Sequence, residues 1–412
     1  MTKKLGMFMK NKSFLMLIIG LLPLVMVLGN SMLIPILPVM EEELNISAVE
    51  VGFLLSVFSI VAAIVIPVVG FLSDRYGRKK IVLISLIFVM IGSIITIVAG
   101  KGVSDPFRWI VIGRVLQGIG AGGTAPLAMA LVGDLFSGQE RSKNLGALEV
   151  FNGIGKVFSP FIGALAALIF WYSAFYVYFI ISLLAFIGIY FSVNSVVQEK
   201  YNESLSSYGR MLVSVLKKEG NWIFPLSFLA SAGLFILFGL LVYLSFEIER
   251  IFAVDGIFKG SVFTIPLGAL TAVSYWTGKQ IGEDHSYMKK LLLIGSAIVL
   301  GALVFLVFSP TFSSLIFGVT MIGMGVGFTL PCINTLITSS VGGKERGLIV
   351  SLYGMIRFLG VAFGPIFFAV WMVEVVDMFV KAAFLFLFMS IWVITALKMN
   401  INLFARKEIK RG

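Results

Sequence analysis

The sequence predicts an all-α integral membrane protein whose twelve transmembrane helices form two pseudo-symmetric six-helix bundles. Three observations predict this fold. Of the 412 residues, 59% are hydrophobic and 13% are charged, against roughly 25% charged residues in soluble domains. Twelve apolar segments are long enough to cross a bilayer. A set of glycines and prolines in the first half recurs in the second half at one fixed spacing.

Each apolar segment is a candidate span, because a helix needs about 20 residues to cross the hydrocarbon core. Lysines precede the first segment, as in a signal peptide, but its apolar run continues to Val39 without a small-residue cleavage site. We therefore expect a retained span. An even number of spans places both termini on one side of the membrane. The segments are 14–39, 51–72, 81–100, 109–133, 145–169, 173–194, 222–244, 258–278, 291–308, 312–338, 347–372 and 378–397.

The distribution of charge predicts which side holds the termini. Most of the 32 lysines and arginines lie in the tails and in the loops on that side, whereas the first loop on the opposite side carries only acids. The positive-inside rule therefore predicts cytoplasmic termini in a cell membrane. It also explains the net charge of +11 without nucleic acid as a partner. We expect a monomer in a bacterial membrane.

An internal repeat predicts two halves with the same orientation. GRVLQGIGAGGTAP in the fourth span aligns without gaps with GVTMIGMGVGFTLP in the tenth, 205 residues later. We expect an N-terminal bundle over 1–194, a cytoplasmic linker over 195–221 and a C-terminal bundle over 222–412, with a binding site between the bundles near the membrane midplane. The recurring residues are Gly113, Gly118, Gly120, Gly122, Thr124 and Pro126.

Three further motifs resemble one known family. GFLSDRYGRKK, residues 70–80, resembles the loop signature of the major facilitator superfamily. GRVLQG in the fourth span and GIGKVFSPFIGA in the fifth are similar to motifs of its drug/proton antiporters, although Ser159 and Ala164 replace two glycines of the fifth-span motif. Asn30 stands where some of these transporters carry an acid. The resemblance implies export of an amphipathic compound in exchange for protons, by rocker-switch alternating access.

The loop 70–80 is the predicted cytoplasmic connection between the second and third spans. Its glycines permit a tight turn, and its acid can pair with bases where the two halves meet. Such a latch favours one orientation of the halves and breaks in the other. The alternative is that the bases only set the topology. The residues assigned to the latch are Gly70, Asp74, Arg75, Gly77, Arg78 and Lys79.

Ionisable residues inside a span normally face the protein interior and have partners. Glu149 is the only acid well inside a predicted span, so we expect it to carry the proton, with Arg114 or Arg357 as its partner. The alternative is a permanent structural ion pair. On a helical wheel of the fifth span, Glu149 falls on a polar face of small residues that is expected to point inward.

Small residues at every fourth position of that face predict close helix packing. Polar residues of the first, fourth and fifth spans and aromatic residues of the seventh span predict a substrate cavity. The packing residues are Gly155, Ser159, Pro160 and Gly163. The cavity residues are Asn30, Gln117, Asn152, Lys156, Phe235, Phe238 and Tyr243.

The same sequence argues against several other classes. One histidine and one cysteine predict no metal site and no cofactor. No GxxxxGK[ST] motif is present, so ATP is not the expected energy source, and no convergent catalytic group predicts an enzyme. A lipid or glycolipid flippase and a nutrient symporter stay open on the same scaffold, as does a membrane sensor without transport.

Overall fold

The computed structural model describes residues 12–193, 205–252, 256–282, 284–340 and 343–399. Within these ranges the chain is helical and has no strand. Twelve helical segments are long and apolar enough to cross a membrane, so the predicted all-α, twelve-span fold is confirmed. The elements are α2 (Lys12–Ser31), η1 (Ile34–Ile36), α3 (Leu37–Leu44), α4 (Ala48–Tyr76), α5 (Arg78–Gly100), α6 (Pro106–Gly122), α7 (Ala125–Leu135), α8 (Gly138–Ala167), α9 (Ser173–Ser192), α10 (Leu205–Phe252), α11 (Ile257–Gln280), α12 (His285–Phe308), α13 (Phe312–Ser340), α14 (Gly343–Trp371) and α15 (Val375–Met399).

Contacts divide the chain into two compact units that do not simply follow chain order. The first unit comprises Met1–Asn202 and Ser245–Thr264, and the second comprises Glu203–Leu244 and Ile265–Gly412. The end of α10 and the start of α11 therefore belong to the first unit, although they lie in the second half of the sequence.

Helix α10 is longer than the seventh span that hydropathy predicts. It runs without interruption from Leu205 to Phe252, 48 residues, so the helical part of the linker and the span form one element. Pro225 lies inside it. A proline removes one backbone hydrogen bond, and long membrane helices tolerate this loss. One proline is thus too weak a signal to end the helix.

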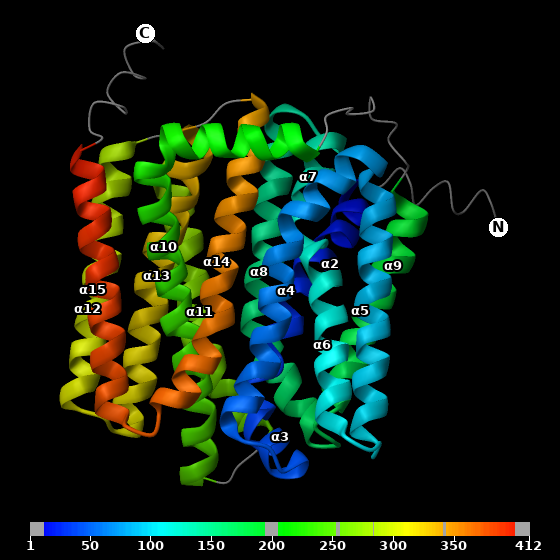
Figure 1. Ribbon diagram of the computed structural model, residues 1–412, viewed down its shortest axis with the longest axis vertical. Coiled ribbons are helices and arrows are strands. Elements are labelled where there is room, and N and C mark those ends of the chain that lie inside the picture. Colours follow the sequence, from blue (N-terminus) through cyan, green and yellow to red (C-terminus); the bar gives the residue numbers. More distant parts are fainter. Residues whose placement is uncertain (1–11, 194–204, 253–255, 283, 341–342, 400–412) are drawn as a thin grey trace. The chain divides into compact units, whose positions relative to one another are not determined.

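Glycines let α6 lie directly against two neighbours in the first unit (Figure 1). A Cβ atom placed on Gly118 would lie 2.6 Å from the carbonyl oxygen of Phe58, and one on Gly122 would lie 2.9 Å from that of Ala62, both on α4. Gly120 faces the carbonyl oxygen of Ser85 on α5 in the same way. Any larger residue at these positions would push the helices apart.

The second unit repeats this packing at the same spacing in sequence. A Cβ atom on Gly323 would lie 2.5 Å from the carbonyl oxygen of Pro266 on α11, and one on Gly327 would lie 2.9 Å from that of Leu270. Gly325 faces Gly295 on α12, where the corresponding distance is 2.6 Å. The repeat in the sequence is therefore a repeat of helix contacts.

The repeat also shows one clear difference. The predicted fourth span is broken between α6 and α7, whereas its copy α13 is continuous through Pro331. Gly123, at the break, faces the hydroxyl of Ser85 and has no room for a side chain. Its copy is Phe328, which stays helical. A second glycine after Gly122 therefore accompanies the break, because glycine weakens a helix interior.

Candidate functional site

Arg114 lies in the middle of α6 and is 0% exposed to solvent. Its Nε donates to the carbonyl oxygen of Leu54 on α4 at 2.9 Å, and its Nη1 donates to the carbonyl oxygen of Gly29 on α2 at 2.7 Å. Nη1 also donates to Oε1 of Gln117 at 2.8 Å. The guanidinium lies 4.4 Å from the ring centroid of Phe58, a favourable position over an aromatic face. Carbonyl dipoles and a ring, all neutral, thus surround a full positive charge.

The end of α2 supplies one of these carbonyl groups because helical hydrogen bonding stops there. The amide of Leu33 donates to the carbonyl oxygen of Asn30 and so leaves the carbonyl of Gly29, its partner in a regular α-helix, to Arg114. Two prolines at residues 35 and 38 follow the break and supply no amide donors. Gly29 itself is required to be small, since a Cβ atom there would lie 2.5 Å from the hydroxyl of Tyr178.

Several buried polar atoms on α6 and on the helices that contact Arg114 or Gly29 have no hydrogen-bond partner among the described residues. They are Nη2 of Arg114, both polar side-chain atoms of Asn30, the hydroxyl of Ser59 on α4 and the hydroxyl of Tyr178 on α9. Buried polar groups are normally paired. A cluster of this size is therefore a candidate site for a polar ligand, and it includes three residues that the sequence singled out: Arg114, Asn30 and, through its bond to the guanidinium, Gln117.

Glu149 does not lie in this cluster. It is exposed on α8, and the hydrogen bonds described for Arg114 go to Leu54, Gly29 and Gln117 instead. A helical wheel gives the direction of a side chain but not its depth, so this exposure could not be read from the sequence, and the role of Glu149 stays a prediction. Arg357, the other predicted partner, is half-buried on α14 in the second unit, 5.6 Å from the ring centroid of Tyr353.

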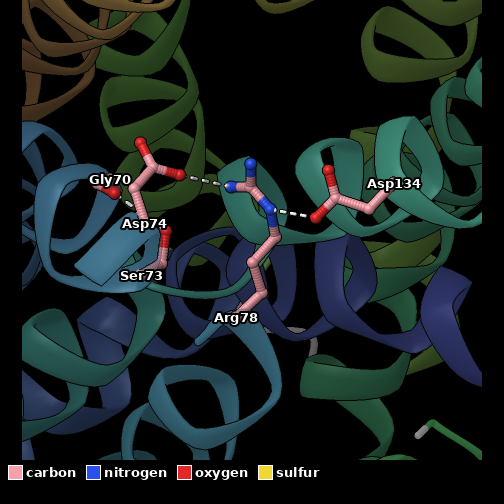
Figure 2. Close-up of polar contacts among 5 residues, drawn as sticks. All are labelled: Gly70, Ser73, Asp74, Arg78 and Asp134. Carbon is pink, nitrogen blue, oxygen red and sulfur yellow. Dashed lines mark hydrogen bonds and ion pairs between the residues drawn. The ribbon is translucent and has the colours of Figure 1, made fainter. Parts of the chain in front are cut away.

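The charged loop forms a second polar site in the first unit. Figure 2 shows Arg78 between two carboxylates, with Nη1 at 3.1 Å from Oδ1 of Asp74 and Nε bonded to Oδ2 of Asp134. Ser73 donates to the carbonyl oxygen of Gly70 at 2.8 Å. These contacts join the end of α4, the start of α5 and the end of α7, so the charges of this loop connect three helices of one unit.

Gly77 and the other bases complete the loop. Gly77 separates α4 from α5 with a φ of 94°, a conformation that favours glycine. Lys79 donates to the carbonyl oxygen of Tyr190 on α9 at 2.8 Å, and Arg75 is exposed beside the ring of Tyr76. Sequence reasoning missed Asp134. The available signal was that Asp134 is the only acid between Asp105 and Glu140, close to the inner end of the fourth span.

The small residues of α8 lie against α2 and the turn that follows it. A Cβ atom on Gly155 would lie 3.0 Å from Leu24, and Gly163 faces the carbonyl oxygen of Met32. Ser159 is buried and donates to the carbonyl oxygen of Gly155, and Pro160 is buried beside it. Asn152 and Lys156, the predicted cavity residues of this helix, are half-buried.

The three predicted cavity aromatics of α10 are buried in the second unit. The ring centroid of Phe235 lies 5.5 Å from that of Phe368 and 5.8 Å from that of Trp371, both on α14. The ring of Tyr243 packs edge-on against that of Phe379 on α15, with the ring centroids 6.2 Å apart. Phe238, which lies between Phe235 and Tyr243 in the sequence, is also buried. The rings of Phe235 and Tyr243 therefore pack against other aromatic rings in the core of the second unit.

An ion pair with a buried lysine joins the end of α10 to the start of α11 in the first unit. The side chain of Lys259 is 1% exposed, and its Nζ lies 2.6 Å from Oε2 of Glu249. Ser245 donates to the carbonyl oxygen of Ile34 at 2.8 Å, and Thr264 donates to that of Val157 at 3.3 Å. Lys259 lies in the first turn of α11, at the start of the span 258–278 that hydropathy predicts.

The chain matches one protein family and is similar to known proteins over most of its length. Residues 19–365 match the family model described as Major Facilitator Superfamily. The chain is 36% identical over 373 residues to the Bacillibactin exporter of Bacillus subtilis, covering 89% of this chain and 93% of that protein. It is 26% identical over 349 residues to Multidrug resistance protein 1 of the same organism, covering 82% and 85%.

Among solved structures, the crystal structure of a D-xylose-proton symporter superimposes with a TM-score of 0.73 at 16% identity, covering 94% of this chain and 96% of that one. At this identity the likeness shows a shared fold. Within the described residues, no group of three or more His, Cys, Asp or Glu side chains could hold a metal ion.

Proposed function

The chain belongs to the Major Facilitator Superfamily, and we propose that it exports an amphipathic small molecule in exchange for protons by rocker-switch alternating access. The observation that carries the proposal is the similarity to an exporter over nearly the full length of both chains. A second relative, a multidrug resistance protein, is similar over most of its length. The fold alone would not separate export from uptake, because the same fold serves a symporter.

The buried charge in α6 supports coupling to ions. A cation inside a membrane protein is costly and normally serves a substrate or proton pathway. Arg114 fits this role, and its contacts join α2, α4 and α6. Glu149 is the proposed proton carrier: it is an acid inside a spanning helix, and its side chain is not buried among other residues, so it is free to take up and release a proton. Arg357 is the proposed basic partner in the second half of the chain.

The loop 70–80 is proposed to control the conformational step. Arg78 ties Asp74 to Asp134, and Lys79 ties α5 to α9. These bonds make four helices of the first unit move as one body, which is what a rocking movement requires. The small residues of α8 and the buried pair of Lys259 and Glu249 add contacts on the same unit.

The test uses inside-out vesicles that hold a proton gradient, acid inside. Lipophilic cations, neutral drugs, bacillibactin and glycolipids are added in turn, and collapse of the gradient is recorded. We expect some compounds to collapse it with wild type and not with Glu149→Gln. Glu140→Gln is the matched control, because Glu140 lies exposed on the same helix and pairs with Lys12.

Three outcomes are informative. Collapse that is lost only in Glu149→Gln supports proton antiport and the assignment of the carrier. Collapse that persists in Glu149→Gln moves the carrier elsewhere, with Asp74, Glu247 and Glu249 the next residues to replace. Absence of any collapse across the panel overturns the proposal and leaves a lipid flippase, a nutrient symporter or a sensor as the function to test.

A further inference from the structure

The charge of Arg114 is not balanced by any acid on the helices that surround it. A guanidinium stays ionised in proteins, and a buried charge is normally paired. Along α2, α4, α5, α6 and α9 the only acids are Glu50 and Asp74, at the two ends of α4. Glu50 is exposed and bonded to Ser47 as part of a capping box. Asp74 bonds to Arg78, and 20 residues of helix separate it from Leu54, roughly 30 Å.

The unpartnered atoms near Arg114 include several hydrogen-bond donors. Nη2 of Arg114, the amide of Asn30 and the hydroxyls of Tyr178 and Ser59 can all donate, and all are buried without a partner among the described residues. They come from four helices: α6, α2, α9 and α4.

Gly29 brings Arg114, Tyr178 and Phe58 close together. Its carbonyl oxygen accepts from Arg114, and a Cβ atom placed on it would lie 2.5 Å from the hydroxyl of Tyr178 and 2.6 Å from Phe58. Asn30 and Ser59 are the next residues after Gly29 and Phe58 in the chain. One uncompensated positive charge and neutral donors on the four helices that meet at Gly29 form an environment that favours an anion.

We propose that this cluster, Arg114 with Asn30, Tyr178 and Ser59, binds a small anionic group, and that in transport this group belongs to an amphipathic anionic substrate. The substrate part rests on the proposed export function; the binding of an anion does not. The same chemistry would accept a free inorganic anion such as chloride, so the experiment distinguishes the two sources. A ligand reaches the buried atoms when the helices part, and α2 is already broken beside Asn30.

Asn30 is the residue that makes the site open to an external anion. An aspartate in its place would supply a permanent carboxylate next to Gly29, whose carbonyl contacts Arg114, and would compete with any ligand. Asn30→Asp is therefore the decisive variant, because it adds a compensating charge and does not leave a hole. Asn45→Asp is its matched control: Asn45 is exposed just after α3, in a left-handed conformation that aspartate also adopts.

The experiment measures equilibrium binding of radiolabelled benzoate to the full chain in nanodiscs, in sodium gluconate. Benzamide, a neutral isostere, and chloride serve as competitors. We expect saturable benzoate binding to wild type and to Asn45→Asp within a factor of two. We expect binding to weaken at least tenfold in Asn30→Asp and about tenfold in Tyr178→Phe, where one donor to the anion is lost. Benzamide should not compete.

Each outcome decides one point. Benzoate binding that chloride displaces supports the site with an organic anion as its ligand. Chloride binding without benzoate binding, measured with radiolabelled chloride, supports an anion site but overturns the substrate assignment. No binding of either, equal competition by benzamide, or unchanged binding in Asn30→Asp overturns the site.

The two proposals fail separately. Gradient collapse by lipophilic cations without any anion binding would leave export standing and remove the site. Anion binding without gradient collapse by any compound would leave the site standing and remove proton-coupled export.

Discussion

Arg114 and Lys259 are both fully buried in the first unit, yet their charges are balanced differently. Lys259 has a carboxylate 2.6 Å away, in Glu249. Arg114 has carbonyl groups, an amide and an aromatic ring. A buried pair of fixed charges serves mainly to hold structure, whereas a cation without a fixed partner can respond to a ligand. The two residues therefore make different predictions when they are replaced.

Lys259→Met should lower the stability of the chain by about 1–3 kcal/mol. This is less than the roughly 3–5 kcal/mol expected for a fully buried pair, because Glu249 is 32% exposed and keeps part of its hydration. The thermal unfolding midpoint of the purified protein, followed by tryptophan fluorescence, measures the effect.

Lys381→Met is the control for this prediction. Lys381 also pairs with an acid, Asp377, at 2.5 Å, but both side chains are about half exposed, so the change should cost between 0 and about 1 kcal/mol. Equal shifts for the two variants would show that burial of Lys259 contributes nothing.

At the residue scale, the sequence identifies which residue types matter better than it identifies their surroundings. Arg114, Asn30 and Gln117 are recognisable as polar residues within apolar spans. Ser59 and Tyr178 complete the cluster, but they are unremarkable in apolar stretches, because serine and tyrosine are common in membrane helices. Their importance depends on Gly29 bringing four helices together, which is a long-range contact that no local pattern encodes.

At the scale of the helices, Arg78 is the contact that ties α4, α5 and α7 at one end of the first unit. Arg78→Gln removes both ion pairs and leaves Asp74 and Asp134 close to each other. We expect the variant to lose about 1 kcal/mol of stability, as for partly exposed charge networks, and to slow gradient collapse in the vesicle assay.

Arg75→Gln tests whether the slower gradient collapse expected for Arg78→Gln is due to the position of Arg78 or only to the loss of one positive charge. Arg75 lies three residues earlier and is exposed beside Tyr76, so the same change of charge should leave the rate of collapse within a factor of two. If Arg75→Gln slowed transport as much as Arg78→Gln, the loop would act through its total charge.

The sequence predicts the existence of the helices, which depends on the length of the apolar segments, better than it predicts where the helices end or break. All twelve spans follow from hydropathy, and the two halves follow from the glycine spacing, because both properties are local or periodic. The break after Ser31 and the extension of α10 from the predicted span back through the linker to Leu205 were not predicted. In each case a proline or glycine is present, and tertiary packing decides whether the helix ends.

At the scale of the whole molecule, the distribution of basic residues predicts which loops face the cytoplasm. The single cysteine, Cys332, is buried, so introduced cysteines can be labelled with little background. We expect a membrane-impermeant maleimide to label Ser104→Cys in intact cells and to label Ser137→Cys only after the membrane is opened. Both serines are exposed, so exposure does not account for the difference. The reverse pattern would invert the topology.

The assignment of 245–264 to the first unit was beyond sequence analysis, since chain order places these residues with the second half. Two of the contacts that join this segment to the rest of the unit are made by Ser245 and Thr264, and each is an ordinary polar residue near the end of a span. Their partners, Ile34 and Val157, lie 211 and 107 residues away in the chain.

The continuous helix α10 has a mechanical consequence. The boundary between the two units falls between Leu244 and Ser245, inside an unbroken helix, whereas in α11 it falls just before Pro266. Because Pro266 has no amide hydrogen, α11 bends easily at that point. In α10 the nearest proline or glycine before the boundary is Gly239. The proposed rocking movement would therefore bend α10 over a longer stretch of helix, whereas α11 would bend beside Pro266.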